Sequence, residues 1–129
     1  MFDWKKPTVQ MLGRWQPWHE GHRALFKRCV DKTGQVIIQV RDVQGASGGD
    51  GQEDNPFDWD VVCLNIETDL KAFGFSRGIH YEIMLVPNVV NITYGRGVGY
   101  AFEEETFEES ITSVSGTKIR SQLRKTGDL

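Results

Sequence analysis

The stretch that decides the fold is Gly13-Arg14-Trp15-Gln16-Pro17-Trp18-His19-Glu20-Gly21-His22, which follows an apolar-leaning run at residues 8–12. This pattern predicts a strand, a tight glycine turn and a helix that begins near Glu20. A helix N-terminus presents unpaired N–H groups and the positive end of a dipole, and both attract phosphate. His19 and His22, three residues apart, can face the same way there. Imidazoles at such an anion site suit a reaction in which a phosphorus centre gains charge.

Outward from this stretch, strands and helices alternate along the chain. Apolar and β-branched runs predict strands, and apolar residues at helical spacing predict helices. The expected strands are residues 8–12, 35–40, 81–86 and 91–94, and the expected helices are residues 20–32, 59–73 and 115–124. This order predicts an α/β fold, a single Rossmann-like domain over residues 1–129 with a parallel sheet and helices on both faces. Residues 121–129 would form the end of the last helix and a tail.

The composition excludes several classes of protein. A length of 129 residues fits one domain. The net charge of −3 argues against a general nucleic-acid binder, which carries a basic excess. Two cysteines, Cys29 and Cys63, are too few for a disulfide framework and are expected to be reduced thiols, with Cys29 in the core. No apolar run approaches the roughly 20 residues of a membrane span, and we see no signal peptide, so a cytoplasmic protein without membrane contact is expected.

Three segments between the expected elements bear on ligand binding. Residues 43–55 are glycine-rich and polar and predict a flexible loop, either a functional lid or a segment without a role. Arg41 and Asp42 follow a strand and would lie at its carboxyl end, where open α/β sheets bind ligands, or form a plain surface pair. Gly95 and Arg96 follow the expected fourth strand. There a small residue lets a ligand approach the backbone closely, and Arg96 would lie at the ligand-binding edge or be a surface arginine.

The quoted stretch resembles the G-R-F-Q-P-F-H-x-G-H element of the HxGH nucleotidyltransferases. We call residues 13–22 the first signature. Near the other end, Val114-Ser115-Gly116-Thr117-Lys118-Ile119-Arg120 resembles the second signature of that family, I-S-S-T-x-I-R. Gly116 stands where many members have a second serine, and Trp15 and Trp18 replace commoner phenylalanines. The Asn-Pro-Phe turn at residues 55–57 is also similar to adenylyl-transferring members.

The resemblance implies roles for individual residues. His19, His22 and Arg120 would be catalytic, since the two histidines contact the triphosphate and Arg120 holds its outer phosphates. The residues that would bind the nucleotide and its phosphates are Gly13, Arg14, Trp15, Gln16, Gly21, Gly95, Arg96, Ser115, Gly116, Thr117 and Lys118. Arg41 and Asp42, from their place at a strand end and not from the resemblance, would bind substrate.

The implied reaction is attack by a phosphate oxygen of a small phosphorylated metabolite on the α-phosphorus of a nucleoside triphosphate, with release of pyrophosphate. Positioning and charge stabilisation can carry such a reaction. Mg²⁺ would be the cofactor, held mainly by the triphosphate and not by protein ligands. The opening of the first signature favours ATP, and the short chain is similar to glycerol-3-phosphate cytidylyltransferases, so CTP stays open. By analogy with relatives, a homodimer is expected.

Three other readings compete with this one. The chain could be a nucleotide-binding or regulatory module that has lost catalysis, against which His19, His22, Thr117 and Arg120 count. A synthetase fragment is disfavoured by the short, acidic chain. A zinc site at His19 and His22 lacks a third ligand other than Glu20.

Overall fold

The computed structural model describes residues 1–43, 55–97 and 99–105, in which strands and helices alternate as the sequence predicts. The elements are β1 (Val9–Gly13), α1 (Glu20–Thr33), β2 (Val36–Arg41), α3 (Trp59–Ala72) and β3 (Tyr81–Val86). Each helix has a local reason to begin where it does, because the side chains of His19 and Asp58 accept hydrogen bonds from the first turns. Gly34, at φ 88°, adopts the left-handed conformation that ends α1.

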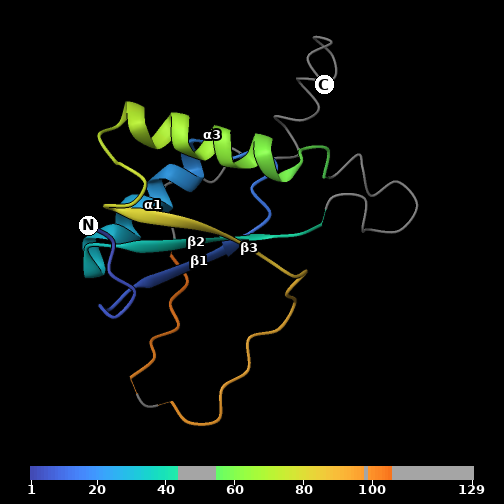
Figure 1. Cartoon of the computed structure of the whole chain (residues 1–129). Helices are drawn as coiled ribbons and strands as arrows, with labels where there is room; N and C mark the ends of the chain where they lie inside the picture. The colour runs from blue at the N-terminus through green and yellow to red at the C-terminus, as the bar shows by residue number, and fades with distance from the viewer. Residues whose placement is uncertain (44–54, 98, 106–129) are drawn as a thin grey trace.

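The three strands form a parallel sheet in the order β1-β2-β3 (Figure 1). Val9, Val36 and Tyr81 lie level with one another, as do Met11, Ile38 and Ile83. Alternate strand residues therefore point to one face, where they are buried against both helices. The helix side chains that complete this core are Phe26 and Cys29 of α1 and Val62, Ile66 and Leu70 of α3. The burial of Cys29 was expected from the sequence.

Both described helices cover the same face of the sheet. The chain crosses from β1 to β2 and then from β2 to β3, and each new strand adds to the same edge of the sheet. When both crossovers have the same handedness, their helices lie on the same face. The described part of the chain is thus a small α/β domain of Rossmann-like type. The sequence predicts helices on both faces, and the further helix that it predicts, at residues 115–124, lies outside the described residues, as does the tail at residues 121–129.

The prediction of a fourth strand at residues 91–94 is wrong. The structure describes this segment as irregular, and Val90, Ile92 and Tyr94 are more than half exposed. Figure 1 shows the chain leaving the sheet after β3 and looping away on the side opposite α3. A β-branched segment forms a strand only when a neighbouring strand pairs with it, and none does so here among the described residues.

The acidic run that begins at Glu103 contacts α1. Lys32 donates to Glu103 at 2.7 Å, and Arg28 donates to Glu105 at 3.1 Å. These ion pairs are partly exposed, as expected of a solvated charged face. In the described ranges, no helix has the length and apolar character needed to cross a bilayer.

Candidate active site

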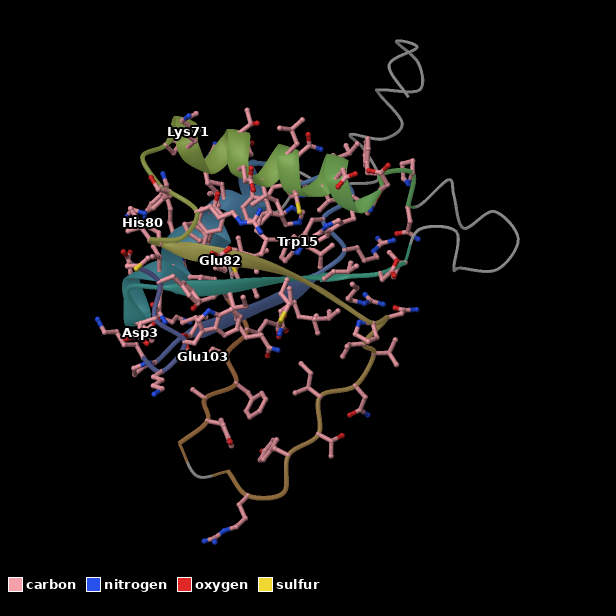
Figure 2. All side chains as sticks on the ribbon, in the orientation of Figure 1. Asp3, Trp15, Lys71, His80, Glu82 and Glu103 are labelled. Atoms are coloured by element: carbon pink, nitrogen blue, oxygen red, sulfur yellow. The ribbon has the colours of Figure 1, made fainter. Side chains whose placement is uncertain are left out.

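The first signature begins as a tight turn at the end of β1. Trp15 has φ 54°, in the left-handed region, and its indole N–H donates to the carbonyl of Gln39 at 3.1 Å. The indole folds back over Gly13, so a Cβ there would lie 2.8–2.9 Å from three ring carbons. Only glycine fits this position without a shift of the ring. Figure 2 shows Trp15 between α3 and the carboxyl end of the sheet, while His80 lies toward the opposite end.

The turn is fastened to the segment that precedes α3. The Gln16 side chain donates to the carbonyl of Phe57 at 2.8 Å and accepts from the N–H of Phe57 at 2.9 Å. Arg14 donates to the side-chain oxygen of Asn55 at 2.8 Å. Asn55 is buried, as is Val43, so both described ends of the expected loop at residues 43–55 are held in the fold. Residues 44–54 lie outside the described residues.

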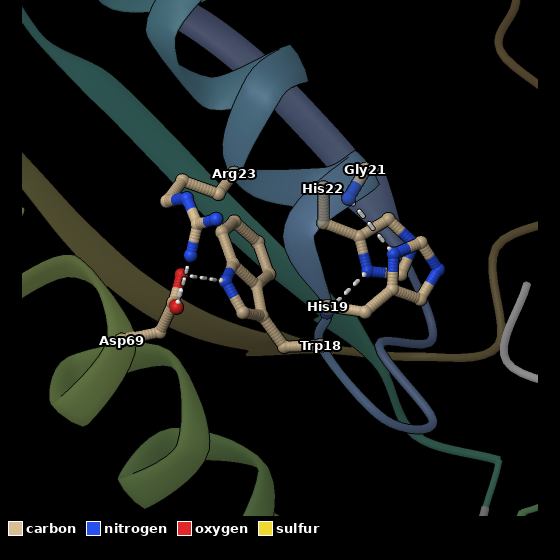
Figure 3. Close-up of polar contacts among 6 residues, drawn as sticks. All are labelled: Trp18, His19, Gly21, His22, Arg23 and Asp69. Atoms are coloured by element: carbon tan, nitrogen blue, oxygen red, sulfur yellow. Dashed lines mark hydrogen bonds and ion pairs between the residues drawn. The ribbon is translucent and has the colours of Figure 1, made fainter. Parts of the chain in front are cut away.

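His19 and His22 are hydrogen-bonded to the start of α1 and stacked on each other (Figure 3). Nδ1 of His19 accepts from the N–H of Gly21 at 3.1 Å, and Nδ1 of His22 accepts from the N–H of His19 at 3.2 Å. Their ring centroids are 3.7 Å apart, with 20° between the ring planes. Since each Nδ1 accepts a hydrogen bond, each neutral ring carries its proton on Nε2. The helix start therefore presents two imidazole N–H donors.

Both histidines resist protonation. Burial, with a smaller contribution from the nearby His19, lowers the pKa of His22 to about 3. Burial also lowers the pKa of His19, although the carboxylate of Glu20 opposes this. A positive charge at a helix N-terminus would in addition meet the positive end of the dipole. At neutral pH, both imidazoles are therefore uncharged, and each carries a proton on Nε2.

The stability of the fold is expected to fall in mild acid because of His22. The unfolded chain regains the ordinary histidine pKa of 6.5, so it takes up a proton that the folded ring refuses. The contribution of the unprotonated His22 ring to the free energy of unfolding is complete above about pH 6.5 and is lost as the pH falls toward about 3. Urea unfolding at pH 7.5 and at about pH 5 measures it. His22→Asn should show a smaller loss than the unaltered chain over this interval, and an equal loss would contradict the assignment.

A cavity of about 250 Å³ opens beside the turn, at the carboxyl ends of β2 and β3 and the start of α3. Arg41 and Asp42 line it, as the sequence predicts for the ligand edge, and Gln16 joins it to the first signature. Arg41 donates to the side chain of Asn88 at 2.7 Å, while its buried Nε–H has no partner among the described residues. Phe57 and Trp59 supply aromatic surface, and Trp59 also packs against the core. The cavity thus combines a cationic group, carboxylates and aromatic rings.

The structure brings together part of the predicted site. Gly13, Arg14, Trp15, Gln16, Gly21 and the two histidines share one junction between β1 and α1. Gly95 and Arg96 lie in the exposed segment after β3, and within the described residues no hydrogen bond or ion pair joins them to the junction. Ser115, Gly116, Thr117, Lys118 and Arg120 lie outside the described residues.

Sequence reasoning missed Asn55 and Asp69 as partners of the first signature. Asp69 of α3 accepts hydrogen bonds from Trp18 and Arg23, at 2.9 and 2.7 Å. The similarity of the Asn-Pro-Phe turn at residues 55–57 to adenylyl-transferring members is a signal that could have pointed to Asn55. Nothing in the local pattern around Asp69 distinguishes it from other helical acids.

Comparison with known proteins adds an independent observation. No protein-family model matches the chain. A nicotinamide-nucleotide adenylyltransferase of Methanococcus aeolicus is 27% identical to it, in an alignment that covers 88% of this chain and 75% of that protein. The similarity runs along most of both chains. The similarity to this named relative points toward the nucleotidyltransferase superfamily.

Proposed function

We propose that the chain transfers a nucleoside monophosphate from a nucleoside triphosphate to a small phosphorylated metabolite. A phosphate oxygen of the acceptor attacks the α-phosphorus and forms the new P–O bond. The bond between the α-phosphorus and the bridging oxygen breaks, and its electron pair leaves with pyrophosphate. The observation that carries the proposal is the pair of Nε2–H donors at the start of α1, fixed by the bonds that their Nδ1 atoms accept.

The two histidines would act through charge stabilisation. Donors fixed before the reaction, in a partly buried site, stabilise the charge that develops on phosphate oxygens without reorganising. Neutral imidazoles keep these donors without a proton that must be taken up or lost near neutral pH. The N–H groups of the first helical turn and the helix dipole favour the same anion. Ser115, Thr117 and Arg120 would complete the phosphate site, with Lys118 and the backbone of Gly116.

Magnesium would enter as part of the substrate. In the part of the chain that the structure describes, no three metal-binding side chains lie together. The two imidazoles do not fit as metal ligands, because Nδ1 is occupied by a backbone N–H and Nε2 carries the proton. We therefore propose Mg²⁺ as the counter-ion of the triphosphate and derive no step through it.

The cavity beside Gln16 is the proposed acceptor site. It adjoins the first signature, and the buried Nε–H of Arg41 can donate to an anionic group. The name of the methanococcal relative makes ATP the first donor to test and nicotinamide nucleotide the first acceptor. CTP with a sugar phosphate or an alcohol phosphate is the alternative pair. Arg96 lies in the exposed segment after β3, and its role toward phosphate is a proposal that rests on the family resemblance alone.

Pyrophosphate release tests the proposal. ATP, CTP, GTP and UTP are each supplied with Mg²⁺ and a panel of phosphorylated metabolites that includes nicotinamide mononucleotide. We expect release with one triphosphate that depends on one acceptor, and mass spectrometry of the product identifies the transferred group. Triphosphate binding without release for any acceptor in the panel would favour the second candidate, a catalytically silent binding module. If the protein neither binds a triphosphate nor releases pyrophosphate, both candidate functions are overturned.

A further inference from the structure

A carboxylate on α3 holds the residues on both sides of the histidine pair. One oxygen of Asp69 accepts from the indole N–H of Trp18 at 2.9 Å, and the other accepts from Arg23 at 2.7 Å (Figure 3). Trp18 immediately precedes His19, and Arg23 immediately follows His22. A single side chain, 51 positions from Trp18 and 46 from Arg23, therefore holds both edges of the site.

Trp18, which is hydrogen-bonded to Asp69, also packs against the ring of His22. The Trp18 ring lies 5.5 Å from the ring of His22 and 5.2 Å from that of Trp15, and Trp15 meets His22 edge-on at 4.8 Å. His22 is thus enclosed by two indoles and the stacked ring of His19. An indole turned away from Asp69 would open one wall and allow the imidazole to rotate off its bond with the N–H of His19.

The contact between Arg23 and Asp69 is more buried and has more partners than an ordinary surface ion pair. The side chains of Arg23 and Asp69 are only 19% and 24% exposed. The guanidinium of Arg23 lies 3.7 Å over the ring of Phe73, so it is held in place from two directions. Both carboxylate oxygens are engaged, and charge-assisted bonds of this kind are stronger than neutral ones.

We propose that Asp69 is a positioning residue of the active site, which acts through Trp18 and Arg23 to hold the two histidine Nε2–H donors toward the substrate. The part of this inference that concerns turnover rests on the proposed function. The part that concerns the histidine rings does not, because it applies to the protein without substrate.

Asp69→Asn is the informative change. An amide of the same size has one acceptor oxygen, so its NH₂ group must face either the indole N–H or the guanidinium, and one of the two bonds is lost. We expect turnover about ten-fold lower with KM for the triphosphate little changed, because a small displacement of catalytic groups costs rate. Trp18→Phe removes the N–H and keeps an aromatic ring. Its effect should not add to that of Asp69→Asn in the double variant.

Glu67→Gln is the matched control. Glu67 lies two residues earlier on α3 and pairs with Arg77, whose other ion-pair partner among the described residues is Glu82 and not a histidine. Its loss should lower stability slightly and leave turnover unchanged. If both variants lose stability alike and both keep full turnover, Asp69 is only a structural residue and the proposal is overturned.

Nitrogen NMR of the imidazole rings separates this inference from the proposed function. Without substrate, His19 and His22 should both show the Nε2–H form, and Asp69→Asn should mix the tautomers of His22 or raise its pKa, whereas Glu67→Gln should not. Unchanged histidine signals in Asp69→Asn would overturn the inference even if turnover fell. A protein without transfer activity but with the expected change in the signals would refute the proposed function and keep the role of Asp69 in holding the rings.

Discussion

Replacing His22 by alanine is expected to lower turnover by about two to three orders of magnitude, the usual effect of removing one preorganised donor to developing charge. The change deletes the Nε2–H that is proposed to donate to phosphate and the Nδ1 that accepts from the N–H of His19. It also removes the ring stacked on His19, so the second donor loses its support. Steady-state pyrophosphate release with the substrates found in the panel measures the loss, and circular dichroism checks that the chain is folded.

Two further variants at this position separate capping from catalysis. Asn places its amide where Nδ1 lies and has no group at Nε2, so His22→Asn should regain stability and not turnover. Gln can place its NH₂ near Nε2, so His22→Gln should regain part of the turnover. His80→Ala is the matched control, because His80 bonds to Ser76 away from the site. A His22→Asn enzyme as active as the unaltered chain would show that the Nε2–H has no catalytic role.

The sequence predicted the junction between β1 and α1 well because its signals are local. The glycine turn, the start of α1 at Glu20 and the apolar stripe of that helix each depend on residues within a few positions of one another. β3 was likewise predicted at its observed bounds, Tyr81–Val86. The prediction for residues 91–94 had the same β-branched character and failed, because pairing of a strand depends on a neighbour that a local pattern does not reveal.

The contacts that hold the site in place were beyond local reasoning. Gln16 and Phe57 are 41 positions apart, and Trp18 and Asp69 are 51 positions apart. In the sequence, Asp69 is one acid among several on an amphipathic helix, and only the packing of α3 over the first signature gives it two donors. The roles of the two Nδ1 atoms were equally hidden, since histidines three apart can also face a metal or solvent. The structure replaces that ambiguity with a defined hydrogen-bonding pattern.

Gln16→Leu is expected to lower the free energy of unfolding by about 2–4 kcal/mol, because leaving buried polar groups unpaired costs about 1–3 kcal/mol each. Leucine has nearly the same size and cannot bond, so both the N–H and the carbonyl of Phe57 lose their side-chain partner. Gln16 is 5% exposed, which leaves little room for water to replace it. Urea unfolding at neutral pH measures the change.

The same substitution on the exposed face of β1 is the control. Gln10 is exposed and bonds to Gln39 across the sheet, so Gln10→Leu should change the free energy of unfolding by no more than about 0.5 kcal/mol.

Gln16 and Phe57 also line the cavity proposed for the acceptor. Gln16→Leu removes the two hydrogen bonds to Phe57 at this cavity, so it should raise KM for the acceptor more than KM for the triphosphate. Equal destabilisation by the two variants would mean that the bonds between Gln16 and Phe57 contribute nothing beyond a surface contact. An unchanged KM for the acceptor would place the acceptor elsewhere.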